Sequence, residues 1–272
     1  MYISFLQFKP EFGNVSYNID RIQVLLSKYL KESAIKPDLM VIPELANSGY
    51  LFSGFDELEA TSETAGEGEF YNSLQKISSE NGINFVAGFN EKSGKDFYNS
   101  AYIIRPDGSF DVYRKIHLFD EEKKWFKPGD KPGIYSLNIN EEEVKIGVMI
   151  CFDWFFPETA RYLALKGADI ICHPANLVMP YCQRAMFTRA LENQVYTITA
   201  NRIGKDINGS KDIFFTGESV ILDPKGNYLA RAKTDSEEIQ SVEIEHTIAR
   251  NKFLNPNNNI FDDRKVNISI EQ

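Results

Sequence analysis

The stretch GVMICFDWFFPETAR (147–161) changes character abruptly at Cys151. The apolar run VKIGVMI (144–150) that leads up to it is typical of a buried strand. Pro157 suits the first turn of a helix, and Gly167 suits the end of that helix. The stretch therefore predicts a strand, a turn and a helix, with a cysteine where the strand ends. Because a free cysteine is usually just a buried core residue, a reactive role for this thiol needs support from elsewhere in the chain.

Strands and helices alternate along the rest of the chain. Apolar residues at helical spacing predict helices over 16–33, 69–81 and 181–194. Apolar runs predict strands over 2–8, 38–42, 83–89, 144–150, 168–174, 195–201 and 239–245. Turn residues at 106–108 and 224–227 predict two hairpins, with strands over 98–105, 110–115, 217–223 and 228–233. The order strand-helix-strand, helix-strand, hairpin occurs once in each half, which indicates a mixed-sheet α/β protein with two layered sheets. Without a linker or low-complexity segment, we expect one domain over residues 1–272.

Composition and charge argue against several classes of protein. The 272 residues allow a sizeable core, and a net charge of −9 without a basic run argues against binding to nucleic acid or to an anionic membrane. No apolar run approaches the roughly 18 residues of a membrane span. The N-terminus, MYISFLQFKPEFG (1–13), is interpreted as the first strand and not as a signal peptide. Cys151, Cys172 and Cys182 lack CxxC spacing, which argues against a disulfide framework and a structural zinc site and favours a cytoplasmic location.

Three reactive side chains follow three predicted strands. Glu44 comes after DLMVIP (38–43), Lys115 after FDVYR (110–114), and Cys151 after VKIGVMI. Sites in α/β sheets form outside the carboxyl ends of strands, so these side chains are candidates for one site. A cation beside a cysteine favours its thiolate, and a carboxylate can take its proton. An ammonium can then hold the negative charge that develops on attack. By analogy with the nucleophile elbow, the backbone N–H of Phe152 is a candidate second donor.

Other kinds of site have less support. A Cys-His hydrolase would use His117 or His173, but local papain or caspase signatures are absent, and we interpret both histidines as supporting or packing residues. AGEGEF (65–70) is not a GxGxxG loop, and neither GxxxxGK[ST] nor GxSxG occurs. A non-catalytic scaffold remains an alternative. A low-pKa Cys151 that alkylates faster than the other cysteines would argue against it.

Longer blocks around these residues resemble a known family. PELANSGY (43–50), YRKIHLF (113–119) and GVMICFDWFFPETAR resemble the three signature blocks of the carbon–nitrogen hydrolase family, the nitrilase superfamily. HPANLVMPY (173–181), RALENQVY (189–196) and the spacing between blocks are also similar, from Ile3 to about Arg264. The closest resemblance is to the archaeal-type small aliphatic nitrilase and amidase branch. It implies a four-layer αββα sandwich and no metal or organic cofactor.

The resemblance also implies roles for individual residues. Glu44 corresponds to the general base, Lys115 to the lysine that stabilises the oxyanion, and Cys151 to the nucleophile. A second glutamate follows the lysine in the family, and here Glu121 and Glu122 are both candidates, with the spacing favouring Glu122. Asn176 resembles a substrate-contacting residue. The expected pocket walls are Tyr50, Phe152 and Trp154.

The implied activity is cysteine-dependent hydrolysis of a small aliphatic nitrile or primary amide to the carboxylic acid and ammonia, through a thioester. ω-Amidase-like and N-carbamoyl-amine activities remain open, and Arg184 and Arg189 are candidates for holding a substrate carboxylate. Relatives commonly dimerise through the helix after the cysteine and through C-terminal segments. We therefore expect a homodimer or higher oligomer, with the segment from about residue 250 used in dimer contacts.

Overall fold

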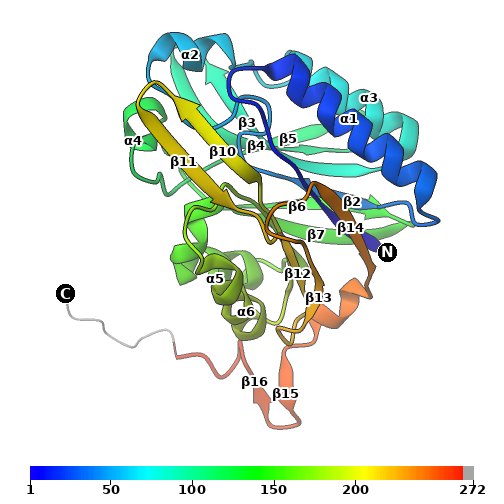
Figure 1. The fold of residues 1–272 in the computed structure, drawn as a ribbon. Helices are drawn as coiled ribbons and strands as arrows, with labels where there is room; N and C mark the ends of the chain where they lie inside the picture. Colours follow the sequence, from blue (N-terminus) through cyan, green and yellow to red (C-terminus); the bar gives the residue numbers. More distant parts are fainter. Residues whose placement is uncertain (266–272) are drawn as a thin grey trace.

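Two six-stranded sheets form the middle of the molecule. The computed structural model describes residues 1–265, and Figure 1 shows the sheets with helices on their outer sides. The first sheet has the order β14-β1-β2-β3-β4-β5, with β1 (Tyr2–Gln7), β2 (Leu39–Ile42), β3 (Asn84–Ser93), β4 (Asp96–Ile104), β5 (Phe110–Arg114) and β14 (Glu238–Glu243). The second has the order β13-β12-β9-β8-β7-β6, with β6 (Gly133–Ile139), β7 (Glu142–Val148), β8 (Ile170–Pro174), β9 (Tyr196–Ala200), β12 (Val220–Leu222) and β13 (Tyr228–Arg231).

Each half of the chain builds one sheet by the same plan. β1, β2 and β3 are parallel, and β4 and β5 continue that sheet in antiparallel pairs. In the second half β7, β8 and β9 are parallel, and β12 and β13 extend the sheet in antiparallel pairs. The exception is β14, which returns from the second half and pairs with β1. The internal repeat that the order of elements suggests is therefore present in the topology.

The alternation of side chains along β2 shows how the layers are sorted. Leu39 and Val41 belong to the core between the sheets, whereas Met40 and Ile42 belong to the core under the helices. Since neighbouring side chains of a strand point to opposite faces, a fully apolar strand must be covered on both sides. Helices α1 (Val15–Glu32) and α3 (Glu69–Asn81) cover this sheet.

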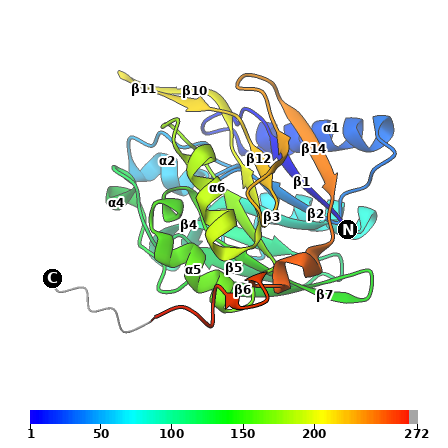
Figure 2. The ribbon, with the colours of Figure 1, turned by 90° about the horizontal axis from the view of Figure 1, so that it is seen from below.

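The second sheet is covered in the same way. Its outer layer consists of α5 (Pro157–Leu165) and α6 (Cys182–Asn193), whose Leu163 and Met186 lie in the core. Figure 2 looks onto these helices from the side opposite α1. The predicted four-layer αββα sandwich is confirmed, with β1, β2 and β3 packed against β8 and β9 across the middle.

Several elements differ from the sequence prediction. The strand predicted over 217–223 is wrong at its start, because Gly217 and Glu218 have φ of 62° and 55° and β12 begins only at Val220. The prediction missed β6, the short helices α2 (Phe55–Ala60) and α4 (Glu122–Trp125), and a hairpin of β10 (Ile203–Asn208) and β11 (Lys211–Thr216). This hairpin projects beyond the sandwich in Figure 2, so most of its side chains lack the apolar periodicity of a buried strand.

The C-terminal segment packs against α5 and the end of α6. It contains the short helix η2 (His246–Arg250), β15 (Phe253–Asn255) and β16 (Asn258–Asn259). Lys252 Nζ donates to the carbonyl oxygens of Asn193 and Gln194, at 2.9 and 2.8 Å. The segment from 250 to 265 is thus attached to the end of α6, and the rest of the predicted extension lies outside the described residues.

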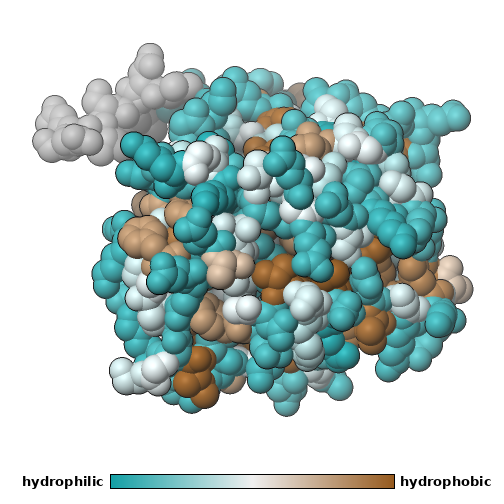
Figure 3. Space-filling view, turned by 90° about the horizontal axis from the view of Figure 1, so that it is seen from above, coloured by the Kyte–Doolittle hydropathy of each residue, from teal (hydrophilic) through white to brown (hydrophobic). Residues whose placement is uncertain are grey.

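The surface of the described residues is mixed. Figure 3 shows the upper face of Figure 1 as largely hydrophilic, with hydrophobic residues in separate patches. Across residues 1–265, the structure has no helix with the length and apolar character that crossing a membrane requires.

Candidate active site

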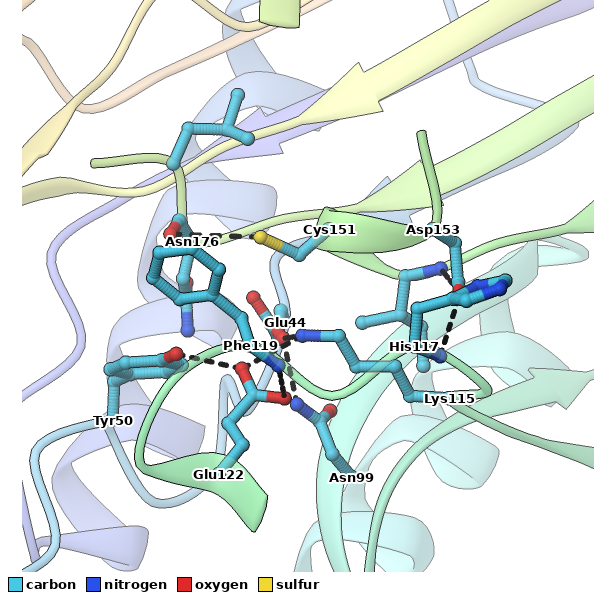
Figure 4. Close-up of polar contacts among 12 residues, drawn as sticks. Glu44, Tyr50, Asn99, Lys115, His117, Phe119, Glu122, Cys151, Asp153 and Asn176 are labelled. Carbon is cyan, nitrogen blue, oxygen red and sulfur yellow. Dashed lines mark hydrogen bonds and ion pairs between the residues drawn. The ribbon is translucent and has the colours of Figure 1, made fainter. Parts of the chain in front are cut away.

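The three reactive side chains singled out in the sequence meet at one end of the sandwich. Glu44 lies two residues after β2, Lys115 directly follows β5, and Cys151 follows β7 at the start of a short helix, η1 (Cys151–Phe155). Figure 4 shows the three side chains facing a shared space together with Glu122. All four are buried. The sheet topology thus brings together residues that are up to 107 positions apart, because it aligns the ends of their strands (44 to 151).

Lys115 lies between two carboxylates. Its Nζ donates to Glu44 Oε1 at 2.6 Å and to Glu122 Oε1 at 2.8 Å. Glu122 is the first residue of α4, whereas Glu121 is partly exposed and pairs with Lys124 and Lys211. The structure therefore places Glu122, and not Glu121, beside the buried ammonium.

Neighbouring groups fix both carboxylates. Asn99 Nδ2 donates to Glu44 Oε1 at 2.7 Å, and Tyr50 Oη donates to Glu122 Oε1 at 2.7 Å. The backbone N–H of Phe119 donates to Glu122 Oε2 at 3.3 Å. The second oxygen of Glu44, Oε2, is buried without a hydrogen-bond partner among residues 1–265. It is the carboxylate oxygen left available to take a proton.

The backbone at Cys151 is in an uncommon conformation. Its φ is +39°, a left-handed value that costs a non-glycine residue on the order of 1–3 kcal/mol. Such strain persists only where the surroundings hold it. Here Asp153 Oδ2 accepts the Ile150 N–H at 2.8 Å, and the Asp153 N–H donates to the Ile150 carbonyl at 3.0 Å. The Phe152 N–H donates to no acceptor within the described part of the chain. The result is a tight strand-to-helix turn of the kind expected from the sequence, with a free N–H next to the thiol.

Burial and charge set the protonation of the cluster. Burial lowers the pKa of Lys115, but Glu122 and Glu44 raise it by more, so the amine stays an ammonium. Burial raises the pKa of Glu122, against the opposing effect of Lys115. Burial and the charge of Glu44 raise the pKa of Cys151 well above its ordinary value. Of the two ways to activate this thiol that the sequence left open, the raised pKa favours proton transfer to a carboxylate over a thiolate at rest. The Sγ–H donates to the Asn176 carbonyl at 3.8 Å.

A small apolar cavity opens beside the thiol. Its volume is about 140 Å³. It is lined by Phe119, Cys151, Phe152, Trp154, Phe155, Asn176, Leu177, Val178, Met179 and Tyr181. This lining contains no charged side chain. Both side-chain polar atoms of Asn176 are buried and unpartnered among residues 1–265, so they are available to a ligand.

A second cavity, of about 420 Å³, lies on the other side of Phe119. Glu122 and Tyr50 line it together with the tip of the β10–β11 hairpin. Phe119 lines both cavities, and Figure 4 shows its ring between Tyr50 and Asn176. The predicted pocket walls are therefore divided, with Tyr50 on the Glu122 side and Phe152 and Trp154 on the thiol side.

The two arginines considered for a substrate carboxylate are engaged elsewhere. Arg189 Nε donates to the Trp154 carbonyl at 3.1 Å, and its Nη1 pairs with Glu192 at 2.9 Å. Arg184 donates to the Pro180 carbonyl at 3.4 Å and is exposed. Neither lines the cavity beside the thiol.

Sequence reasoning missed Asn99 and Phe119. Asn99 interrupts the apolar pattern of YNSAYIIR (98–105) and is 1% exposed, so a polar residue inside a predicted strand was the available signal. Phe119 lay within a quoted block, but its position depends on a turn at Asp120, whose φ is +46°. Among residues 1–265, no cluster of three or more His, Cys, Asp or Glu side chains has the arrangement of a metal site.

Comparison with known proteins relates the chain to one family. A family model described as carbon-nitrogen hydrolase matches residues 3–252, which include every side chain of the candidate site. A Pyrococcus abyssi protein named nitrilase is 43% identical over 264 residues, covering 97% of each chain. A 2-oxoglutaramate amidase of Bacillus subtilis is 31% identical over 262 residues, covering 90% of this chain and 94% of that protein. The solved structure of Saccharomyces cerevisiae Nit3, a member of branch 10 of the nitrilase superfamily, has a TM-score of 0.78 at 26% identity, over 92% of both chains.

Proposed function

This chain belongs to the carbon–nitrogen hydrolase family, and from that premise we propose that it hydrolyses a small uncharged aliphatic nitrile or primary amide to the carboxylic acid and ammonia. The observation that carries the proposal is the buried cluster of Glu44, Lys115 and Glu122 beside the Cys151 thiol, at the edge of a cavity without a charged side chain. A thiol, a base and a fixed ammonium are the groups that acyl transfer through a covalent intermediate requires.

In the proposed reaction, the free oxygen of Glu44 takes the Cys151 proton as sulfur attacks the substrate carbon. Because burial and the charge of Glu44 raise the pKa of the Cys151 thiol, we expect the proton to transfer as sulfur attacks. The Lys115 ammonium and the Phe152 N–H hold the negative charge that forms on the amide oxygen or the nitrile nitrogen. Glu122 orients Lys115 through the 2.8 Å hydrogen bond between them.

The later steps depend on the substrate. An amide loses ammonia, protonated through Glu44, and leaves a thioester on Cys151. A nitrile first gives a thioimidate. One water then adds to the thioimidate carbon, and loss of ammonia gives the same thioester. In both cases Glu44 activates a further water that releases the carboxylic acid and restores the thiol. A nitrile thus consumes two waters and an amide one.

ω-Amidase-like and N-carbamoyl-amine activities are the alternatives. A dicarboxylic acid monoamide would present a free carboxylate, and the cavity beside Cys151 has no cation in its lining. A carboxylate buried in such a cavity without a partner would cost about several kcal/mol, the usual penalty for a buried unpaired ion. The similarity to a 2-oxoglutaramate amidase keeps this substrate class in the test.

An ammonia-release screen over aliphatic nitriles, aliphatic amides, dicarboxylic acid monoamides and N-carbamoyl amines tests the proposal. We expect turnover of uncharged nitriles or amides, with a mass increment of the acyl group on the peptide that contains Cys151. Cys151→Ala should fold and release no ammonia. Turnover by that variant, or an acyl group on Cys172 or Cys182, would contradict the assignment of the nucleophile.

We also propose that the protein is a cytoplasmic homodimer that pairs through α5, α6 and the C-terminal segment. Large apolar side chains are exposed on this face, namely Phe155, Tyr162, Leu165, Phe187 and Leu191. Apolar side chains of this size, exposed on neighbouring elements, support an interaction surface there. The three cysteines are free thiols, as in proteins of a reducing compartment.

A further inference from the structure

His173 is a buried titratable residue that the proposed reaction does not use. It lies on β8, directly opposite Thr199 of β9, and is 0% exposed. Its Nε2 lies 2.9 Å from the Cys151 carbonyl oxygen, and its Nδ1 lies 3.1 Å from Thr199 Oγ1. The ring therefore contacts the backbone of the cysteine and not its sulfur.

The partners of the two ring nitrogens determine where the proton sits. A carbonyl oxygen can only accept, so Nε2 carries the hydrogen and donates to Cys151. Nδ1 then has the lone pair and accepts from the Thr199 hydroxyl. Burial lowers the pKa of His173 to about 4, although the hydrogen bond to the Cys151 carbonyl opposes this effect, so the ring is neutral near pH 7. A neutral ring with Nε2–H presents no base to the thiol, which removes a Cys-His pair from consideration here.

The hydrogen bond to the Cys151 carbonyl also fixes the next N–H. The peptide bond between Cys151 and Phe152 is trans, as are all those described. In a planar trans peptide the C=O and the N–H point in opposite directions. A donor that holds the carbonyl on the β8 side therefore holds the Phe152 N–H away from β8.

We propose that His173 is a positioning residue for this N–H, which it aims at the site where the substrate's negative charge develops. This inference rests on the proposed function. The left-handed φ of +39° at Cys151 requires support. Asp153 supplies it from within the turn, at Ile150, and His173 supplies it from outside the turn, at the Cys151 carbonyl. Loss of His173 lets the 151–152 peptide rotate toward an unstrained conformation. The Phe152 N–H then no longer points at the site of the developing negative charge.

Two variants of the full chain separate this role from simple packing. His173→Leu removes the donor, whereas His173→Gln keeps an N–H donor at a similar reach. We expect His173→Leu to lower kcat by about 10- to 100-fold with KM nearly unchanged, since loss of one oxyanion donor typically costs about 100- to 1,000-fold. The kcat of His173→Gln should stay within about fivefold of the wild-type value, because this variant keeps an oxyanion-positioning donor.

Two further readouts distinguish loss of the N–H from displacement of the thiol. Alkylation of Cys151 by iodoacetamide displaces iodide at a saturated carbon and develops no oxyanion, so its rate should be unchanged in His173→Leu. An aldehyde analogue of the substrate adds to the thiol as a thiohemiacetal, and its affinity should fall by the same factor as kcat. A His173→Leu variant with wild-type kcat, or one in which alkylation slows as much as turnover, would overturn the inference.

A measurement on the wild-type chain covers the case in which His173→Leu does not fold. Nitrogen-15 NMR of histidine-labelled protein should show His173 as the neutral Nε2–H tautomer, and finding Nδ1–H would overturn the inference. The proposed function has a separate test. If the wild type releases no ammonia in the substrate screen the function fails, whereas equal turnover by wild type and His173→Leu defeats only the role of His173.

Discussion

Cys151 shows how one residue can be both buried and reactive. Burial and Glu44 raise the pKa of its thiol, because both disfavour a further negative charge in a cluster that already holds two carboxylates. The same Glu44 is the nearest base once a substrate carbon accepts electrons from sulfur. Cys172 and Cys182 are more deeply buried than Cys151, and no carboxylate affects their pKa. Burial alone raises the pKa of Cys172 above its ordinary value. Reactivity at this site therefore depends on the neighbours of the thiol and not on a low resting pKa.

Phe119 is predicted to limit the length of the substrate, because its ring lies between the cavities on the thiol side and the Glu122 side. Phe119→Ala should join the two spaces. We expect kcat/KM for substrates lengthened by two or three methylenes to rise relative to the smallest substrate by about tenfold or more. Steady-state kinetics over a homologous series measures this. The control is Phe155→Ala, which lines only the thiol-side cavity and is 55% exposed; an equal change in both variants would contradict the prediction.

Gly88 is predicted to be required for the position of Glu44. A Cβ on Gly88 would lie 2.4 Å from Glu44 Cα and 2.5 Å from the Pro43 carbonyl oxygen. Gly88→Ala must therefore push the Glu44 backbone away from β3, and we expect at least a tenfold loss of kcat and about 2 kcal/mol of stability. Kinetics and urea unfolding measure the two effects. Gly54→Ala is the control, since nothing lies within 4 Å of its Cβ position; comparable losses there would rule out the steric explanation.

At the scale of elements, the site depends on where strands end and on the short segments that follow them. Glu44, Lys115 and Cys151 could be placed at strand ends from the sequence because apolar runs stop abruptly before them. Glu122 and Phe119 could not be placed in the same way, since α4 has four residues and gives no periodic signal. The position of Glu122 is set instead by hydrogen bonds to Lys115 and Tyr50.

Lys252 is predicted to stabilise the junction between α6 and the C-terminal segment. Its ammonium donates to two carbonyl oxygens at the end of α6, where a cation is favourable. Lys252→Met should lower the free energy of unfolding by about 1–3 kcal/mol, as expected for the loss of hydrogen bonds to a charged group. It should also speed proteolytic removal of the C-terminal segment. Urea unfolding and timed proteolysis measure both effects, with exposed Lys225→Met as the control; unchanged proteolysis would show that the segment is held by other contacts.

At the scale of the whole molecule, His173 links stability to pH. Its pKa is about 4 in the folded protein, where burial lowers it, and 6.5 is its ordinary value. As pH falls from 6.5 to 4, His173 binds a proton in the unfolded chain but stays neutral in the folded chain. The free energy of unfolding should therefore fall through this window, by up to about 3 kcal/mol from this residue. Urea unfolding at pH 7 and pH 4.5 measures it, and His173→Gln should lose that part of the slope; equal slopes in both proteins would refute the assignment.

The proposed homodimer can be tested through the face formed by α5 and α6. Leu165 and Leu191 are 39% and 41% exposed, and replacing both with Glu would place two charges in the proposed interface. We expect the double variant to elute as a monomer by size exclusion with light scattering, while the wild type elutes as a dimer. Val24→Glu, on α1 and 55% exposed, should leave the dimer intact. A double variant that remains dimeric would place the interface elsewhere.

The sequence alone determined the layers and the ends of the central strands. Those features depend on local periodicity, as β2 shows by sending Leu39 and Val41 to one core and Met40 and Ile42 to the other. Resemblance of three blocks to a known family then indicated which strand ends hold the chemistry. Periodicity could not reveal the β10–β11 hairpin or α4, because their positions depend on contacts with distant parts of the chain.

Only the tertiary structure decided which groups meet and which protonation state each one has. It placed Glu122 and not Glu121 beside Lys115, because the turn at Asp120 directs the first residue of α4 inward. It raised the thiol pKa, because desolvation and the charge of Glu44 act only after folding. It also brought His173 to the Cys151 carbonyl across two neighbouring strands. Local sequence can specify the start and end of a strand, whereas the direction of a hydrogen bond or the charge of a buried group depends on what the rest of the chain packs around it.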